Sequence, residues 1–468
     1  MTQTADERVV IKAVAGDRFT PYSLARKLDA KVLLESSSFE KGKERFSVLL
    51  VNEAFRVYQR AGEMFFVNEA GERRIKSGAK DILDVICYFA DQHKPLGLEL
   101  PFPSGGIGYL SYEFARYCDR INFTEKPGEE RVPEACFLFG NLYLIFDHYT
   151  DIIYLIAVDY VEARTDLDAL IAETEKTLKN LDFTYLQEPE KGLAAGLGDD
   201  AAEREAYMAG VEKVREHIIA GDILQGVLSR RVTVKTTIPP LEAYRHLRGT
   251  NPSPYLFYLD FNDFVLFGSS PEVHVKASDG VAEIHPIAGT RRRGKNEAED
   301  AALEEELKQD EKEKAEHLML VDLARNDLGR VCKPGTVEVS EFMGVERYSH
   351  VMHLVSRVRG ELESKSAAAV VRATFPAGTV SGAPKIRAME IIDSLEPETR
   401  GFYAGLVGYF GPEGEMDTCI TIRSALQIGD MVTLQAGAGI VYDSTPEREY
   451  EETQEKLGAL LAAIETDL

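Results

Sequence analysis

The sequence predicts an α+β fold built on large, mostly antiparallel β-sheets. Strand-like and helical runs follow one another in mixed order rather than in strict alternation, which is typical of α+β rather than doubly wound α/β proteins. Two strongly apolar runs, "FLFGNLYLIF" and "DIIYLIAVDYV", are separated by little more than the polar "DHYT", which predicts an antiparallel hairpin. No internal repeat with a period of about 20 to 50 residues is visible.

The composition is that of a globular chain with enough apolar material for more than one core. The chain has 468 residues, of which 44% are hydrophobic and 28% charged. This length predicts two domains, or one large compound domain with a regulatory lobe. The formal net charge of -24 argues against a nucleic-acid scaffold, because neutralising backbone phosphates requires a basic face.

Cysteine usage and the N-terminus indicate a cytoplasmic protein that is not exported. The five cysteines are scattered and never form a C-x-x-C pair, so neither a disulfide framework nor a zinc site is predicted. The first residues, "MTQTADERVVIKAV", lack a basic segment followed by an apolar one. The longest apolar run reaches only about half of a membrane span. We therefore expect a soluble protein without membrane contact.

Residues 1–186 form an N-terminal part in which strands predominate. Apolar runs predict strands at residues 46–51, 64–68, 137–146 and 151–161. From residue 187 to 203 the sequence loses hydrophobic periodicity and gains Gly, Pro and acidic residues, which indicates a linker or a long surface loop. We place the main boundary there and assign residues 204–468 to a C-terminal part.

The C-terminal part opens with a helix that runs to Ala220, where Gly-Asp ends it and a strand follows. An acidic helix is predicted from Asn296 to Leu328, and a last helix has Thr445 as N-cap and Pro446 in its first position. Further strands are predicted in "YLFYLDF", "FVLFGSS", "AEIHPIAG", "YSHVMHLVSRV", "FYAGLVGYFG", "DTCITIRSALQI" and "MVTLQAGAGIVY".

Two pairs of glutamates lie three residues apart on predicted helices, Glu313 with Glu316 and Glu449 with Glu452. Each pair therefore shares one helix face. Two such faces across a cleft would form an oxygen-ligand site suited to Mg²⁺, which takes a few carboxylates together with waters and ligand oxygens. A solvated acidic surface is the alternative that spacing alone leaves open.

A histidine and an arginine could also carry chemistry. His353 could transfer protons near neutral pH, or it could be a buried histidine that is hydrogen-bonded to the backbone. Its odd separation from His350 on a strand argues against joint chelation, because the two rings then face opposite sides. Arg423, between apolar strand residues, needs an anionic partner, either a substrate carboxylate or an internal acid.

Glycine-rich turns are predicted at "PIAGT", "PAGTVSGAPK" and "QAGAGIV", and none matches a nucleotide-binding loop. They could offer backbone N–H groups to a carboxylate, or they could be plain structural turns. The basic run Arg291, Arg292 and Arg293 precedes the acidic helix, so we expect it to form ion pairs with that helix.

These motifs occur in an order that resembles the chorismate-utilising enzymes, most closely the anthranilate synthase component I family. The resemblance is dense over about residues 205–465 and looser before them. It implies two large β-sheets packed as a sandwich, with helices outside and the active site in the cleft between the sheets. The ten motifs are "GDILQGVLSRR", "NPSPYLFYL", "GSSPE", "PIAGTRRRG", "EHLMLVDLARNDLGR", "VMHLVSRVRG", "FPAGTVSGAPK", "GFYAGLVGYFG", "DTCITIRSAL" and "QAGAGIVYDSTPEREYEET".

The resemblance implies that the four glutamates hold Mg²⁺ against the ring carboxylate of chorismate, with Glu316 and Glu452 as the direct ligands. The enolpyruvyl carboxylate would lie against Arg423 and Tyr403. The full set of substrate-binding residues implied by the resemblance is Gly289, Thr290, Thr379, Tyr403, Arg423, Gly437, Ala438, Gly439 and Lys456.

The implied reaction is attack of ammonia on the ring carbon beside the one that bears the carboxylate, followed by loss of the ring hydroxyl and elimination of pyruvate. Hydroxide is a poor leaving group, so a general acid is required. Glu272 matches the family's position for that acid and would be kept protonated by burial. His353 matches the histidine associated with pyruvate elimination, when the ring loses a proton to become aromatic.

Two positions distinguish the branches of the family. Relatives that add water carry a lysine where this chain has Gln225, and an amide cannot activate water at neutral pH. In 4-amino-4-deoxychorismate synthase a nucleophilic lysine typically stands where this chain has Ala288. Both residues favour anthranilate as the product. The alternatives are 4-amino-4-deoxychorismate synthase component I and a non-catalytic tryptophan sensor.

"LLESSSF" and "NPSPY" resemble the segments with which the family binds tryptophan as a feedback inhibitor. Leu256 stands where relatives often have methionine, a change that roughly conserves volume, so we expect inhibition to persist. No glutaminase module is apparent, so ammonia would come from a glutamine amidotransferase subunit in a heterotetramer. The implied tryptophan-binding residues are Glu35, Ser36, Asn251, Pro254, Tyr255, Leu256, Val407 and Tyr409.

Overall fold

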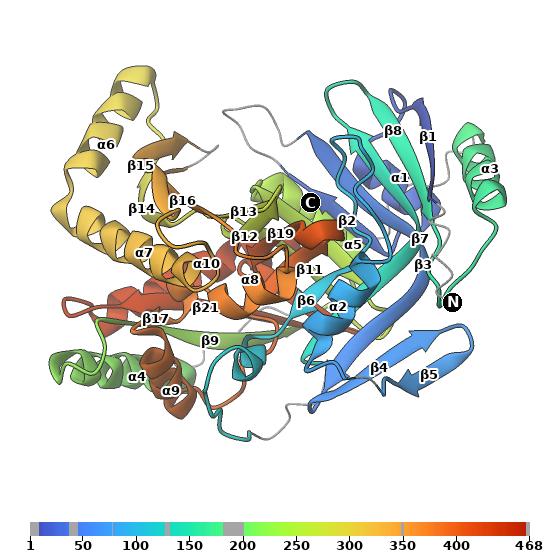
Figure 1. The fold of residues 1–468 in the computed structure, drawn as a ribbon. Helices are drawn as coiled ribbons and strands as arrows, with labels where there is room; N and C mark the ends of the chain where they lie inside the picture. The colour runs from blue at the N-terminus through green and yellow to red at the C-terminus, as the bar shows by residue number, and fades with distance from the viewer. Residues whose placement is uncertain are drawn as a thin grey trace.

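Long antiparallel strands and peripheral helices make up the computed structural model, which describes residues 9–36, 45–76, 78–126, 132–180, 201–347 and 351–464 (Figure 1). The strands are β1 (Val9–Ala15), β2 (Val32–Glu35), β3 (Phe46–Arg60), β4 (Glu63–Asn68), β5 (Gly71–Arg74), β6 (Ile107–Leu110), β7 (Ala135–Asp147), β8 (Ile152–Val158), β9 (Gln225–Lys235), β10 (Tyr255–Asp260), β11 (Val265–Ser270), β12 (Val273–Ser278), β13 (Val281–Ile284), β14 (Ile287–Arg292), β15 (Glu338–Arg347), β16 (Val351–Glu361), β17 (Gly382–Ala383), β18 (Leu406–Phe410), β19 (Met416–Ile420), β20 (Ser424–Ile428) and β21 (Met431–Ile440). The helices are α1 (Pro21–Leu28), α2 (Ile82–Ala90), α3 (Leu167–Lys179), α4 (Ala201–Ile219), α5 (Pro240–Thr250), α6 (Glu297–Gln309), α7 (Glu311–Gly329), α8 (Ala367–Thr374), α9 (Lys385–Leu395) and α10 (Pro446–Ile464), with short 3-10 helices η1 (Tyr112–Tyr117), η4 (Gly378–Val380) and η5 (Pro412–Gly414).

Two large sheets share the long strands β3 and β7. The first runs β1-β8-β7-β3-β2-β10-β11-β20-β21-β9-β17, and the second runs β5-β4-β3-β7-β6-β18-β19-β12-β13-β16, with β14 and β15 also paired to β16. The β3–β7 register shifts between Leu50 and Phe55, where β3 passes from one sheet to the other. Every pairing of the described strands is antiparallel, and β7 and β8 form the expected hairpin, so the α+β fold class is confirmed.

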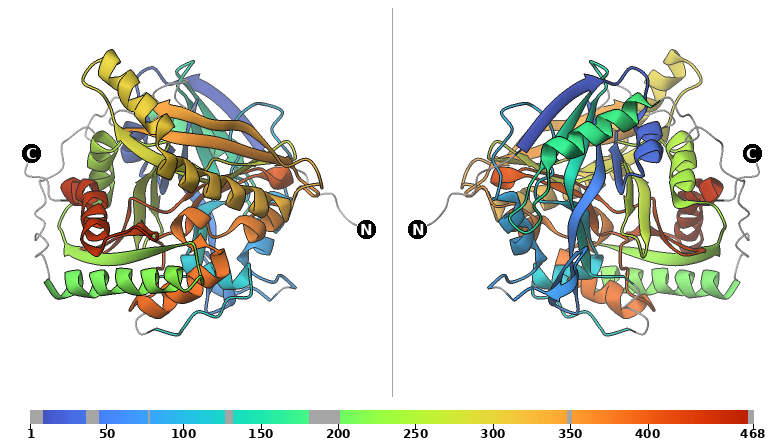
Figure 2. Two further views of the ribbon diagram at one scale, coloured as in Figure 1. Left: turned by 90° about the vertical axis from the view of Figure 1, so that its left-hand side faces the viewer. Right: turned by 90° about the vertical axis from the view of Figure 1, so that its right-hand side faces the viewer.

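The main core lies between the two sheets. It joins residues of both sheets and from both sides of the proposed boundary, such as Phe137, Phe257 and Leu406, each at most 1% exposed. A second core packs α1, α5 and α10 onto the outer face of the first sheet through Leu24, Leu247 and Leu457. Figures 1 and 2 show these helices on the outside of the sheets. Burial of this apolar area is the dominant favourable term for the fold.

Three local expectations are wrong. The acidic helix is two helices, because Asp310 has extended backbone and its carboxylate caps α7 by accepting hydrogen bonds from the backbone of Lys312 and Glu313. Residues 201–203 of the proposed linker are helical and begin α4, whereas residues 187–200 lie outside the described residues. Two of the predicted glycine-rich turns are strands: the first six residues of "QAGAGIV" lie in β21, which agrees with the strand predicted over "MVTLQAGAGIVY", and the last four residues of "PIAGT" lie in β14.

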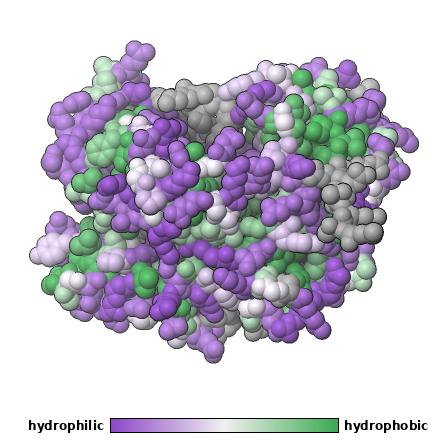
Figure 3. Space-filling model, in the orientation of Figure 1, coloured by the Kyte–Doolittle hydropathy of each residue, from purple (hydrophilic) through white to green (hydrophobic). Residues whose placement is uncertain are grey.

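Hydrophilic side chains cover much of the face in Figure 3, including the region of α6 and α7 on the left. The three arginines that precede α6 are paired with acids there, as expected: Arg291 with Glu306, Asp310 and Glu313, Arg292 with Glu299, and Arg293 with Asp300. Among the helices that the structure describes, none combines the length and apolar character needed to cross a bilayer.

Candidate active site and adjoining cavity

The two glutamate pairs lie on helices that approach each other from different parts of the chain. Glu316 on α7 and Glu452 on α10 are close enough for their charges to interact. Burial, followed by the charge of Glu313, raises the pKa of Glu316. Burial likewise raises the pKa of Glu449, and Glu452 adds to the effect. Negative charge is therefore concentrated between α7 and α10.

These glutamates have the donor chemistry of a Mg²⁺ site. In the part of the chain that the structure describes, no three His, Cys, Asp or Glu side chains already converge as metal ligands. Mg²⁺ does not require such a cage, because it is commonly held by one or two carboxylates plus waters and substrate oxygens. Burial and neighbouring negative charge disfavour the ionised forms of Glu316 and Glu449, and a divalent cation would offset both effects, so the residues fit the ion.

Lys456 connects this acidic region to β21. Its Nζ lies 2.8 Å from Glu452 Oε1 and donates a hydrogen bond of 2.8 Å to the carbonyl oxygen of Gly437. A side chain at Gly437 would lie 3.0 Å from the Tyr403 hydroxyl, so the glycine allows β21 to pass close to that ring. Burial raises the pKa of Tyr403, which keeps its hydroxyl protonated.

Gln225 opens β9 and faces both α7 and β21. Its Nε2 donates a hydrogen bond of 3.4 Å to Glu316 Oε1. Its Oε1 is buried and has no hydrogen-bond partner among the described residues. A Cβ at Gly439 would lie 2.8 Å from the Gln225 amide nitrogen, so only glycine leaves room there. Ala438 lies between Gly437 and Gly439 on β21 and is fully buried.

Arg423 does not stand inside a strand, contrary to expectation. It lies in the break between β19 and β20, with a left-handed φ of 47°. Its guanidinium donates a hydrogen bond of 3.4 Å to Asn251 Oδ1, and no carboxylate lies within ion-pair distance among the described residues. Burial lowers its pKa. A half-buried cation without an internal acid is suited to receive an anionic ligand.

His353 lies on β16 beside β14. Its Nδ1 is 2.9 Å from the carbonyl oxygen of Gly289 and 3.1 Å from Thr290 Oγ1. A carbonyl can only accept, so Nδ1 carries the hydrogen and Nε2 carries the lone pair. Burial lowers the pKa of His353, and the charge of Arg423 lowers it further. The ring is therefore neutral near pH 7. His350 lies outside the described residues.

Glu272 follows β11 and faces the 3-10 helix η4, which contains Thr379. The two residues line a small cavity together with Leu320 and Ile420. Burial raises the pKa of Glu272 to about 7, and Thr379 and Lys456 oppose the shift only in part. The expectation that burial favours its protonated form therefore agrees with its surroundings.

These contacts link the predicted active-site residues into one network. Arg423 is near His353, which bonds to Gly289, and a Cβ at Gly289 would lie 3.2 Å from Glu313 Oε2. Gln225 bonds to Glu316, and Lys456 links Glu452 with Gly437. The linked residues include a cation, Arg423, the carboxylates of α7 and α10, and His353, whose Nε2 carries a lone pair.

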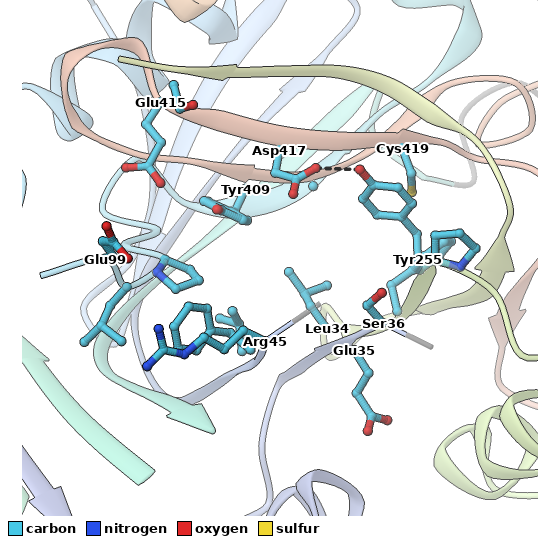
Figure 4. A pocket seen from close by; sticks show the side chains of 18 of the residues that line it. Leu34, Glu35, Ser36, Arg45, Glu99, Tyr255, Tyr409, Glu415, Asp417 and Cys419 are labelled. Atoms are coloured by element: carbon cyan, nitrogen blue, oxygen red, sulfur yellow. Dashed lines mark hydrogen bonds between the residues drawn. The ribbon is translucent and has the colours of Figure 1, made fainter. Parts of the chain in front are cut away.

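A separate cavity of about 580 Å³ lies between β2, β10 and β18 (Figure 4). Its volume suits a small organic ligand. Ser36 Oγ is buried there and has no hydrogen-bond partner among the described residues, whereas Tyr255 donates a hydrogen bond of 2.7 Å to Asp417. Seven of the eight residues assigned to tryptophan line this cavity, namely Glu35, Ser36, Pro254, Tyr255, Leu256, Val407 and Tyr409.

The side chains of two of the eight residues do not face into the cavity. The Glu35 carboxylate points away from the cavity (Figure 4) and is held by α5, where it accepts a hydrogen bond of 2.7 Å from Tyr244 and pairs with Arg248 at 3.0 Å. Asn251 does not line the cavity, and its side chain contacts Ser269 and Arg423. Residues 37–39 of "LLESSSF" lie outside the described residues.

The cavity also contains charged residues that the sequence did not single out. Arg45, Lys365 and Glu415 line it from three distant parts of the chain. Burial raises the pKa of Glu415 to about 7, and the charges of Asp417 and Asp279 add to the effect. No local pattern predicts this cluster, because its members meet only through the pairing of β18 with β19 and the approach of loops.

Comparison with known proteins identifies the family. The model of the chorismate binding enzyme family matches residues 38–462 of this chain. The chain belongs to the chorismate-binding enzyme family. It is 56% identical over 458 residues to anthranilate synthase component 1 from Spirochaeta aurantia, which covers 97% of this chain and 95% of that protein. It is 42% identical to anthranilate synthase component 1 from Aquifex aeolicus, with 96% and 93% coverage.

Solved structures of the chorismate-binding enzyme family share the fold. Anthranilate synthase component I from Streptococcus pneumoniae matches with a TM-score of 0.77 and 36% identity over 91% of this chain and 94% of that one. The menaquinone-specific isochorismate synthase from Escherichia coli matches with a TM-score of 0.73 at 20% identity, over 98% of this chain and 95% of that one. The second match bears on the fold alone.

Proposed function

We infer that this chain is the chorismate-converting component of an anthranilate synthase, which forms anthranilate and pyruvate from chorismate and ammonia. The inference rests on the 56% identity to an anthranilate synthase component 1 across nearly the full length of both chains. Support also comes from Glu272, His353, Arg423 and the glutamates of α7 and α10, whose side chains have the acid, base, cationic and metal-binding chemistry that this reaction uses.

Substrate binding divides between the two ends of the site. Glu316 and Glu452 would hold Mg²⁺, supported by Glu313 and Glu449, and the ion would supply positive charge to the ring carboxylate. Arg423 and the Tyr403 hydroxyl, beside the backbone of residues 437–439, receive the enolpyruvyl carboxylate. Gly289, Thr290 and Thr379 are proposed to contact the substrate as well. A dianionic substrate is thereby bound by an acidic protein without a basic surface.

Glu272 and His353 divide the proton transfers. Glu272 holds a proton on its carboxyl group and donates it to the departing ring hydroxyl, because hydroxide leaves poorly without protonation. His353 accepts the ring proton at Nε2 during elimination of pyruvate, while Gly289 fixes its Nδ1 hydrogen. Gln225 offers no basic group to activate water, so ammonia, which is already nucleophilic, is the favoured nucleophile.

Formation of anthranilate is tested directly. The purified chain is incubated with chorismate, Mg²⁺ and ammonium, and product fluorescence is recorded. We expect anthranilate emission. 4-Amino-4-deoxychorismate as product would instead identify the other aminating branch, against which Ala288 argues, since it has no side-chain amine. A non-catalytic sensor would leave chorismate unconsumed.

Replacing Glu316 with glutamine is expected to lower Mg²⁺-dependent activity at least about 100-fold, because the amide removes one of the two charges proposed to hold the ion. Glu311→Gln is the matched control on the same helix, since Glu311 is exposed and pairs only with Lys314 among the described residues. Titration with Mg²⁺ and circular dichroism are measured for both. Unchanged turnover in Glu316→Gln would contradict the metal assignment.

We propose that the 580 Å³ cavity binds tryptophan as a feedback inhibitor. Support comes from its volume, from the convergence of β2, β10 and β18 on it, and from the Ser36 hydroxyl that is left for a ligand. Leu256 is 2% exposed in its wall. Because the chain contains no tryptophan, bound tryptophan can be followed by its own fluorescence with little protein background.

Ser36→Phe is expected to raise the tryptophan concentration needed for half-inhibition at least about tenfold, because the ring fills cavity space. The uninhibited rate should change little, since Ser36 contacts none of the proposed catalytic residues. Ser36→Ala removes only the hydroxyl and should give a smaller effect. Inhibition that persists unchanged in Ser36→Phe would place the inhibitor elsewhere.

Ammonia is proposed to come from a separate glutamine amidotransferase subunit, with which this chain would form a heterotetramer in the cytoplasm. The designation of its relatives as component 1 supports a second component. Glutamine should support turnover only after that subunit is added, whereas ammonium should support it in either case.

A further inference from the structure

Arg400 is the largest side chain that is completely buried in the described part of the chain. Its guanidinium pairs with Glu396 through Nε at 2.9 Å and Nη2 at 2.7 Å. Nη1 donates a hydrogen bond of 2.7 Å to the Val380 carbonyl, and Nη2 also donates to the Val227 carbonyl. One planar fork therefore holds a carboxylate and two separate backbone segments.

Each of these segments carries a residue of the proposed active site. Val227 lies two residues after Gln225 on β9, and Val380 follows Thr379 in η4. The guanidinium carbon also lies 5.7 Å from the centre of the Tyr403 ring. Arg400 itself contacts none of the reacting groups proposed above, so it could act only through these neighbours.

Glu396 connects the Arg400 side chain to β9 and, through β9, to β21. It accepts hydrogen bonds from the backbone nitrogen of Ser229 at 2.8 Å and from its hydroxyl at 2.7 Å. Ser229 pairs directly with Gly437, which lies beside Tyr403 and accepts from Lys456. The Arg400–Glu396 pair thus contacts β9 at Val227 and Ser229, and it is linked to β21 through the pairing of Ser229 with Gly437.

Two residues of the N-terminal part, on η1, also contact Arg400. Glu113 of η1 accepts from the backbone nitrogens of Arg400 at 2.7 Å and Gly401 at 3.0 Å. The Tyr112 ring packs 4.6 Å from the guanidinium carbon. Contacts therefore hold both the backbone of Arg400 and its side chain, so the orientation of the guanidinium is fixed.

We propose that Arg400 is a positioning residue for substrate binding, which sets the distances among Gln225, Thr379, Tyr403 and Gly437. The proposal rests on the function inferred above. A lysine would keep the positive charge but would be a point donor, unable to hold the Val227 and Val380 carbonyls and Glu396 in one plane. Loss of the fork should loosen the pocket that receives the enolpyruvyl carboxylate.

Arg400→Lys is tested in the ammonium-dependent assay beside the wild-type chain. We expect KM for chorismate to rise at least about tenfold while kcat changes less than about threefold, because binding geometry is lost and the proton-transfer groups remain. Wild-type KM in a folded Arg400→Lys variant would overturn the positioning role. A wild-type chain that forms no anthranilate would overturn the inferred function, and with it this proposal.

A second pair of variants separates positioning from stability. Arg400→Met leaves Glu396 as a buried uncompensated charge and should lower the melting temperature. Adding Glu396→Gln removes that charge and keeps an acceptor for Ser229, so the melting temperature should recover. We expect the raised KM to persist in the double variant. Recovery of KM together with the melting temperature would mean that Arg400 serves stability alone.

Discussion

Glu272→Gln is expected to lower kcat for anthranilate formation by about 10²- to 10⁴-fold, the usual contribution of a general acid. Glutamine has nearly the same shape and cannot release a proton to the departing hydroxyl. The variant should still bind chorismate, because Arg423 and the glutamates of α7 and α10 that are proposed to hold Mg²⁺ are unchanged. Single-turnover fluorescence and chorismate binding are the measurements. Activity within threefold of wild type would exclude Glu272 as the acid.

The pH dependence of the wild-type enzyme follows from the same residue. Burial raises the pKa of Glu272 to about 7, so the carboxyl group is mostly protonated below pH 7 and mostly ionised above it. Only the protonated form can act as the acid. We expect kcat/KM to fall about tenfold for each pH unit well above 7, and this decrease to disappear in Glu272→Gln.

Stability gives an independent check on the burial of Glu272. A folded-state pKa of about 7, against an ordinary value of 4.5 for a glutamate, means that ionisation opposes folding, so stability is lost as pH rises from 4.5 through 7. Glu272→Gln should therefore be more stable than wild type at pH 8, by up to about 3 kcal/mol. At pH 4 the two should differ little. Equal stability at both pH values would contradict the shifted pKa.

Arg423→Met is expected to lower kcat/KM for chorismate at least about 100-fold, mainly through KM, because a charged hydrogen-bonding partner of a carboxylate is lost. Arg423→Lys should recover only part of the affinity, since lysine cannot make the same two-pronged contact. Arg215→Met, at a half-buried arginine that is paired with Glu212, is the matched control.

The same arginine variant should also be more stable than wild type. Burial lowers the pKa of Arg423 because its charge is poorly compensated, so an apolar side chain of similar length removes a desolvation cost. A rise in melting temperature together with weaker chorismate binding would mark Arg423 as a residue kept for its ligand. A fall in melting temperature with unchanged kcat/KM would mark it as structural.

Local signals account for the parts of the fold that the sequence predicted. The apolar runs of β7 and β8 predicted their pairing, and Pro446 predicted the start of α10, because each depends on neighbouring residues alone. Asp310 shows the limit: it could have continued a helix by composition, yet its side chain caps the next one. Capping and helix continuation compete closely in an acidic run.

The candidate site was predictable only where a motif already named its members. Glu272 and Arg423 came from such motifs, but the left-handed backbone of Arg423 depends on the strands on either side of it. Arg400 and Glu396 carry no sequence signal of their role, since their partners on β9 and η4 are about 20 to 170 residues away. Glu415 is similar, because its pKa is raised mainly by burial in the folded chain and then by the charges of Asp417 and Asp279.

The shared strands β3 and β7 bear on how the gene for this protein can be divided. Residues 204–468 alone would lack the neighbours of β10 and β18, which pair with β2 and β6. Two sheet edges with unpaired N–H and C=O groups would then be open to other chains. An expressed C-terminal fragment should therefore aggregate, and co-expression with residues 1–186 should restore a soluble product.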